Sequence, residues 1–91
     1  FAGTIAGGLH GIRHELEPAA PFEGNGYEDR DVERIPWNLP DAIDLWRNSS
    51  IARECFGEEA HHWILRSAEA EWEDFNDTVT DWELKRYFER I

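Results

Sequence analysis

The hydrophobic positions of the first sixteen residues recur in steps of three and four. They are Ala2, Ile5, Leu9, Ile12 and Leu16. This spacing places them in one stripe along an α-helix, so we predict a helix over residues 1–16. The helical pattern is already established at Phe1, and we therefore expect the chain to be a piece of a longer protein.

Glycines recur every four residues within the same segment, at Gly3, Gly7 and Gly11. One side of the predicted helix therefore has no side chains, although each glycine costs roughly 1 kcal/mol relative to alanine in a helix. In lipid this spacing favours helix dimerisation, but polar residues close by make a membrane helix a poor interpretation. We expect instead that another soluble element packs close to this backbone.

Residues 17–38 interrupt the helical pattern with Pro18, Pro21, Gly24 and Gly26. Proline and glycine end helices and favour turns, so we predict a long polar loop. Loops of this length are uncommon within compact domains and often carry function or cover a partner.

Residues 39–91 are predicted to form a run of helices with recognisable ends. Asn38 can cap a first helix, with Asp41 three residues later. Ser49 or Ser50 can cap a short second helix that Gly57 would end. Another helix follows, whose shared face comprises Ala60, Ile64, Ala68, Trp72 and Phe75.

Thr80 and Glu83 have the spacing of a capping box, which predicts the start of a last helix. The inner face predicted for that helix comprises Leu84, Tyr87, Phe88 and Ile91. No alternating pattern of useful length indicates a strand. The fold class is therefore predicted as all-α, with about four to five helices and a long polar loop.

The charge balance excludes several classes of partner. The 91 residues carry nine basic and twenty acidic groups, a formal net charge of −11. Sites for nucleic acid or for anionic membrane surfaces need clustered Lys and Arg, so we expect neither nucleic acid nor membrane as a partner.

The 41% hydrophobic share and five Trp argue against disorder. A single cysteine, Cys55, excludes an internal disulfide and fits a reducing compartment, so we expect a cytoplasmic protein.

Two histidines are spaced as metal ligands on a helix, but the pattern is incomplete. His10 and His14 lie four apart, which places both imidazoles on one face. Glu15 follows the pair instead of lying inside it, so the metalloprotease pattern His-Glu-x-x-His is absent. We therefore predict no metal site here and interpret both side chains as solvent-facing or helix-end histidines.

The other candidates are interpreted as structural. His61 and His62 are adjacent and point about 100° apart on a helix, which does not suit one ion. Glu69, Glu73 and Asp77 form an acidic row that we interpret as a solvated face. Cys55 has no feature of a nucleophile, and the five Trp suit packing better than base stacking. The residues by themselves thus describe a helical packing segment with no catalytic, cofactor-binding or metal-binding residues.

Several segments, in order, resemble the end of glutamine synthetase family enzymes. The first is Ala6-Gly-Gly-Leu-His-Gly-Ile-Arg-His-Glu-Leu-Glu-Pro18, followed by the loop Glu23-Gly-Asn-Gly-Tyr-Glu28. The later ones are residues 39–46, 51–59, 70–75 and 79–91. Each motif is weak alone, but their order is fairly specific. The ending Thr80-Asp-Trp-Glu83 resembles the branch of γ-glutamyl-polyamine and other amine ligases.

The resemblance implies an ATP-dependent ligase that joins glutamate to ammonia or an amine through γ-glutamyl phosphate. Residues 1–91 would be the C-terminal helical segment of a larger α+β catalytic domain, with helix 1–16, loop 17–38 and helices 39–91. The parent enzyme would use ATP with Mg or Mn and would be a homo-oligomer. The family's metal and phosphate ligands have no counterpart in this chain, so the segment alone would bind no cofactor and be inactive. It would pack on the rest of its catalytic domain and on neighbouring subunits.

Tyr27 is the one position that matches a family feature, the tyrosine that some members adenylylate to lower activity. Gly26 before it and Glu28-Asp29-Arg30 after it depart from that pattern, which favours an anchoring loop tyrosine over a regulatory one.

The alternative to the ligase is a non-enzymatic acidic helical module that binds a protein partner through exposed Trp and Leu side chains.

Overall fold

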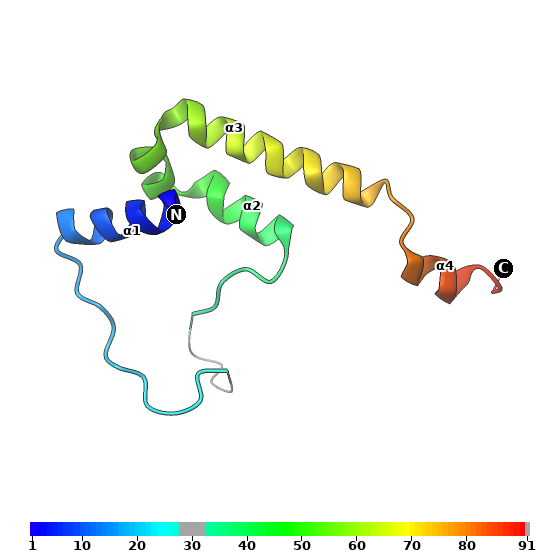
Figure 1. Cartoon of the computed structure of the whole chain (residues 1–91), viewed down its shortest axis with the longest axis horizontal. Helices are drawn as coiled ribbons and strands as arrows, with labels where there is room; N and C mark the ends of the chain where they lie inside the picture. The colour runs from blue at the N-terminus through cyan, green and yellow to red at the C-terminus, as the bar shows by residue number, and fades with distance from the viewer. Residues whose placement is uncertain (28–32, 91) are drawn as a thin grey trace.

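The computed structural model describes residues 1–27 and 33–90. It contains four helices: α1 (Ala2–Arg13), α2 (Leu39–Asn48), α3 (Ser50–Asn76) and α4 (Asp81–Tyr87) (Figure 1). No strand occurs within these described ranges. The prediction of an all-α segment is therefore confirmed for the described part of the chain.

The first helix ends earlier than predicted, at Arg13 instead of Leu16. Glu15 adopts a left-handed conformation with φ of 49°. Its N–H donates to the Ile12 carbonyl at 3.3 Å, and the Leu16 N–H donates to the Gly11 carbonyl at 3.0 Å. These two bonds form the Schellman motif that closes many helices. The boundary was missed because a glutamate, not a glycine, occupies the left-handed position.

The caps of α2 and α3 were predicted correctly. The Asp41 N–H donates to the Asn38 side chain at 2.9 Å, and the Ala52 N–H donates to the Ser49 hydroxyl at 3.0 Å. Of the two serines considered, Ser49 is the cap. At Gly57 the backbone leaves the helical region, with φ of 77° and ψ of 161°, so α3 is kinked where the sequence predicted a helix end. Glycine adopts such a positive φ at little cost.

The capping box at the start of α4 is confirmed. The Glu83 N–H donates to the Thr80 hydroxyl oxygen at 3.3 Å, and the Thr80 N–H donates to the Glu83 carboxylate at 2.8 Å. Leu84, Tyr87 and Phe88 are all exposed, so they do not form an inner face within the described chain. Ile91, the last member of that predicted face, lies outside the described residues.

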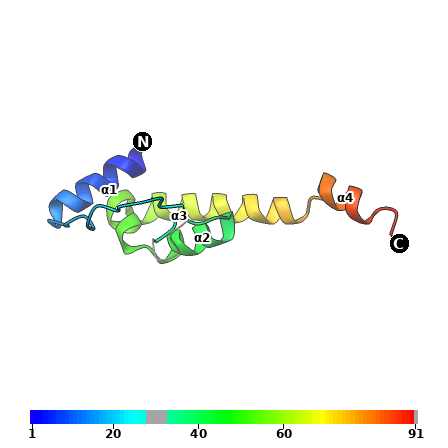
Figure 2. The ribbon, with the colours of Figure 1, turned by 90° about the horizontal axis from the view of Figure 1, so that it is seen from below.

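The helices pack around the first half of α3. Among the described helices, α2 and α1 contact α3, whereas α4 contacts none of the others. Both ribbon views show α2 beside α3, and α4 beyond the far end of α3 (Figures 1 and 2). The segment between α1 and α2 has no helix or strand in its described parts, as predicted, and it runs away from the helices (Figure 1).

The described chain has little interior of its own. Only Ile43, Ala52 and His61 are buried among the described residues. The radius of gyration is 18.5 Å, against roughly 12 Å for a compact domain of this length. Ile5 and Leu9 of the α1 stripe remain 63% and 46% exposed. Contact with α3 is made from the adjacent side of α1, where Ala6 and His10 are partly covered.

Candidate functional site

A reciprocal pair of hydrogen bonds joins α2 to α3. The Trp46 indole N–H donates to the His61 carbonyl at 3.1 Å, and the His61 Nε2 lies 2.7 Å from the Trp46 carbonyl. Because a carbonyl only accepts, Nε2 carries the proton. The two rings are stacked, with centroids 5.4 Å apart and planes 8° from parallel. His61 is thus a structural residue that fixes the angle between the two helices.

A second contact between α2 and α3 is ionic. The Arg47 guanidinium donates to Glu69 at 2.9 Å and pairs with Asp44, while Arg66 also pairs with Glu69. The hydrogen bond from Arg47 is the main cause that lowers the pKa of Glu69, and burial opposes it. The same bond raises the pKa of Arg47.

The predicted acidic row on α3 is therefore not one solvated face. The Glu69 side chain is only 19% exposed and is held by Arg47 and Arg66. Glu73 and Asp77 are exposed.

An apolar hollow of about 330 Å³ opens where α1, α2 and α3 meet. Gly3 and Gly7 line it from α1, Leu45 and Trp46 from α2, and Phe56 from α3. A methyl group added at Gly3, Gly7 or Gly11 would meet no atom within 4 Å. The glycine stripe is therefore open in the described chain, and nothing in this part of the structure uses the close approach that it permits.

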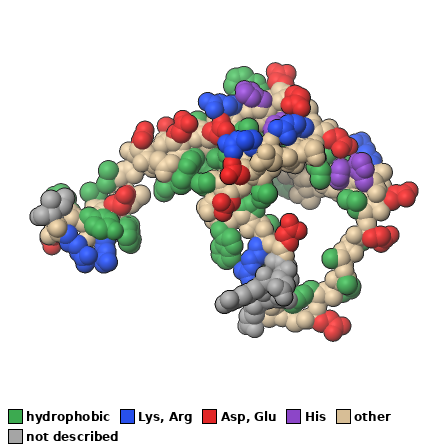
Figure 3. Space-filling view, turned by 180° about the vertical axis from the view of Figure 1, so that it is seen from behind, with side chains coloured by type: hydrophobic (Ala, Val, Ile, Leu, Met, Phe, Trp, Pro, Cys, Tyr) green, Lys and Arg blue, Asp and Glu red, His purple; other side chains and the backbone are tan. Residues whose placement is uncertain are grey.

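All four helices expose large hydrophobic side chains, and the space-filling view shows separate groups of hydrophobic side chains on one face of the molecule (Figure 3). Large exposed members on the helices are Ile5, Leu9, Ile12, Leu45, Ile51, Trp63, Ile64, Phe75, Trp82, Leu84 and Tyr87. Scattered exposed apolar residues are ordinary, but broad apolar surface marks sites that contact other polypeptide. Apolar exposure on all four helices is the main surface feature of the described chain.

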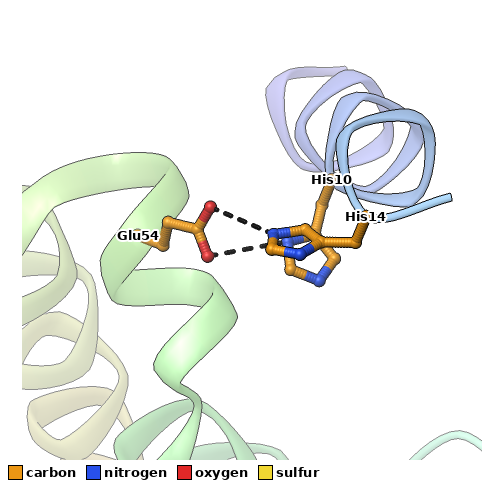
Figure 4. Close-up of side chains that lie close together, drawn as sticks. All are labelled: His10, His14 and Glu54. Carbon is orange, nitrogen blue, oxygen red and sulfur yellow. Dashed lines mark ion pairs between the residues drawn. The ribbon is translucent and has the colours of Figure 1, made fainter. Parts of the chain in front are cut away.

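The structure brings His10 of α1 and His14, the residue that follows α1, together with Glu54 of α3 (Figure 4). The His10 Nδ1 lies 3.7 Å and the His14 Nε2 lies 3.5 Å from the Glu54 carboxylate oxygens. The His10 Nδ1 is buried and has no hydrogen-bond partner. The sequence showed the two histidines on one helix face, but it gave no sign of Glu54 because that residue comes from another helix.

The remaining predicted residues lie apart from this cluster or at its margin. The Tyr27 side chain is 91% exposed. Its N–H donates to the Asn25 side chain at 3.2 Å, and its carbonyl accepts from Arg34 at 3.2 Å. Cys55 is half-buried at the contact of α1 with α3, with its sulfur 3.9 Å from the Ala6 carbonyl oxygen.

The arginines of α2 and α3 are not arranged to bind a nucleoside triphosphate. Arg47, Arg53 and Arg66 each pair with a carboxylate, from Asp44, Glu58 or Glu69. Phosphate sites need cations or N–H groups directed at the ligand, and the chain as a whole has a net charge of −11. Arg47, Arg53 and Arg66 therefore do not form a site for the phosphates of ATP. In the described ranges, every helix is too short or too polar to cross a lipid bilayer.

Comparison with known proteins gives one consistent family. The family profile of the glutamine synthetase catalytic domain matches residues 1–87. The gamma-glutamylethanolamide synthetase of Streptomyces coelicolor is 43% identical over 90 residues, which cover 99% of this chain and 19% of that protein. The glutamine synthetase of Thermotoga maritima is 34% identical, with 96% of this chain and 21% of that protein covered.

A eukaryotic relative matches as fully. The type-1 glutamine synthetase 2 of Dictyostelium discoideum is 37% identical, covering 100% of this chain and 18% of that protein. The chain thus spans about a fifth of the length of the curated relatives described here. No solved structure matches this chain.

Proposed function

The chain belongs to the glutamine synthetase catalytic-domain family, and from that premise we propose that it is the C-terminal helical part of an ATP-dependent ligase. The parent enzyme joins glutamate to ammonia or an amine. The observation that carries the proposal is the match over residues 1–87. The uncovered apolar surface supports it, because a segment of a larger domain has neighbours that cover such faces.

The reaction of the parent enzyme proceeds in two steps. ATP phosphorylates the γ-carboxylate of glutamate, which gives γ-glutamyl phosphate and ADP. The nitrogen nucleophile then forms the amide bond and displaces phosphate. ATP supplies the phosphoryl group, and a divalent metal, Mg or Mn, would neutralise the charge of that group during transfer. None of the residues described here is assigned a part in these steps.

The role of this segment is to support the catalytic part of the domain. Its α2–α3 pair is fixed by Trp46 and His61, so the α2 and α3 walls of the apolar hollow form a preformed surface. The third wall comes from α1, which contacts α3. We propose that the rest of the same catalytic domain packs on that surface. The exposed aromatic residues of α3 and α4 would contact the same domain or neighbouring subunits of a homo-oligomer.

The nitrogen donor proposed for the parent enzyme is an amine. The relative at 43% identity is named a gamma-glutamylethanolamide synthetase, whereas those at 34% and 37% are named glutamine synthetases. The sequence Thr80-Asp81-Trp82-Glu83 points to the same branch. An amine donor predicts a higher kcat/KM with ethanolamine or a polyamine than with ammonia.

The test uses the full-length polypeptide that carries this segment. It is incubated with ATP, glutamate and one nitrogen donor at a time, namely ammonia, ethanolamine or putrescine, and the amide is measured by mass spectrometry alongside released phosphate. We expect ATP-dependent γ-glutamyl amide, and no turnover by the 91-residue chain. Absence of amide with every donor contradicts the ligase, and preference for ammonia contradicts only the amine branch.

A further inference from the structure

We propose that His10, His14 and Glu54 form a zinc site that ties α1 to α3. One ligand atom from each residue lies within 4.8 Å of the other two. Two imidazole nitrogens and one carboxylate oxygen are a donor set that suits Zn²⁺. The inference departs from the expectation, based on α1 alone, that this chain has no metal ligands, and it does not depend on the ligase activity.

The distances fit an ion between the three side chains better than direct bonds among them. The His10 Nδ1 lies 3.7 Å from Oε2 of Glu54, and the His14 Nε2 lies 3.5 Å from Oε1 of the same carboxylate. An N–H···O hydrogen bond is shorter, at about 2.7–3.2 Å. Ligand atoms at about 2.0–2.1 Å from a tetrahedral zinc ion lie about 3.3–3.4 Å from one another. Small side-chain movements would therefore complete the coordination.

The burial of the cluster supports the same assignment. The His10 Nδ1 is buried and lacks a hydrogen-bond partner, which is costly unless something else binds its lone pair or proton. The side chains of His14 and Glu54 are 49% and 47% exposed, whereas that of His10 is 13% exposed. One side of the cluster is thus open, so water can occupy a fourth position as in other three-ligand zinc sites.

The site would fix an otherwise weakly attached helix. Among the described helices, α1 contacts only α3, and its apolar stripe is exposed. A zinc ion that bridges residues 10 and 14 to residue 54 joins the two helices without a disulfide or a large hydrophobic contact. The role proposed for the ion is to hold α1 on α3, because its ligands come from the two sides of the one contact that α1 makes among the described helices.

The test is a zinc titration of the 91-residue chain against a chromophoric chelator. We expect one zinc ion per chain, and a weakening of binding by at least 10-fold in His14→Ala and in Glu54→Gln, because even second-sphere partners of zinc are worth about 10- to 100-fold. The matched controls are His62→Ala and Glu59→Gln, exposed residues of the same types outside the cluster. These should bind zinc as the wild type does.

Two further readouts separate loss of a ligand from loss of fold. Circular dichroism without metal should be the same for all five proteins, because the four changed residues are exposed. Zinc should raise the midpoint of thermal unfolding of the wild type and the controls, but not of His14→Ala or Glu54→Gln. A wild-type chain that binds no zinc, or cluster variants that bind like the controls, overturns the proposal.

Discussion

At the residue scale, His61 is the side chain that determines most clearly how α2 lies on α3. It is one of three buried residues in the described chain, and its ring both stacks on Trp46 and bonds to the Trp46 carbonyl. Removal of the imidazole leaves the Ser49 N–H, at 3.2 Å, as the remaining donor to that carbonyl. The lost hydrogen bond and the lost ring stacking together cost about 1–3 kcal/mol.

His61→Ala is therefore expected to speed hydrogen exchange of the Trp46 indole N–H by about 5- to 150-fold, as this cost implies for local opening. The measurement is NMR-detected exchange of that proton. His62→Ala, at the exposed neighbouring position, should leave the rate within about 2-fold, as ordinary surface substitutions do. Equal exchange rates in the two variants would show that the contact between Trp46 and His61 does not hold α2 on α3.

Residue-level contacts across helices were the part of the site that the sequence could not predict. His61 and His62 are adjacent and of one type, so nothing local indicates which of them faces Trp46. Glu54 is likewise separated from His10 and His14 by the whole loop and α2. Such pairings depend on how helices dock, and helix periodicity gives faces but not docking partners.

At the element scale, the capping box of α4 makes that helix sensitive to acid. The Thr80 N–H, and then its hydroxyl, donate to Glu83 and lower the pKa of Glu83, against a smaller opposing effect of burial. Because the pKa of Glu83 is lower in the folded state, the ionised carboxylate stabilises the helix fully at pH values above the unfolded pKa of about 4.3. This stabilisation is lost as the pH falls through the folded-state pKa.

We therefore expect the helicity of residues 81–87, followed by backbone chemical shifts, to be constant from pH 7 to 5 and to fall below about pH 4.3. Glu83→Gln should show a smaller decrease, because glutamine retains a capping oxygen but does not titrate. Glu89→Gln, at an exposed position past α4, should behave as the wild type. If helicity decreases equally in Glu83→Gln and in the wild type, titration of Glu83 is not the cause of the acid sensitivity.

The glycine stripe of α1 gives a second prediction at this scale. In the 91-residue chain a methyl group at Gly7 meets no atom within 4 Å, so Gly7→Ala should stabilise α1 by up to about 1 kcal/mol through helix propensity. In the full-length protein, where we propose that polypeptide packs on this backbone, overpacking should cost about 1–3 kcal/mol and outweigh that gain.

Gly8→Ala is the matched control, since Gly8 lies outside the stripe and also has open space around it. It should stabilise both the 91-residue chain and the full-length protein. Helicity of the chain and the unfolding midpoint of the full-length protein are the measurements. A full-length Gly7→Ala protein as stable as the Gly8→Ala protein would mean that nothing packs on the stripe.

Element ends were largely predictable because their causes are local. Asn38, Ser49 and Thr80 each cap the helix that follows through their own side chain, and Gly57 supplies the positive φ at the kink. The end of α1 was wrong by three residues, because Glu15 adopts a conformation that favours glycine. The Schellman bonds to Gly11 and Ile12 stabilise that conformation, and no sequence pattern announces it.

At the scale of the whole molecule, the described chain has three helices joined by polar and aromatic contacts and a fourth that contacts none of them. Three buried residues form a small interior for a chain of this length. The apolar stripe of α1, the hollow between α1 and α2, and the aromatic residues of α4 are all exposed. These features agree with a segment whose neighbours belong to the rest of the catalytic domain.

The most direct test of this account is hydroxyl-radical footprinting of the 91-residue chain and of the full-length protein under the same conditions. We predict that Ile5, Leu9, Trp63 and Trp82, all exposed in the chain, are labelled severalfold less in the full-length protein. Equal labelling of these side chains in both proteins would contradict the claim that this segment is a packing surface of a larger catalytic domain.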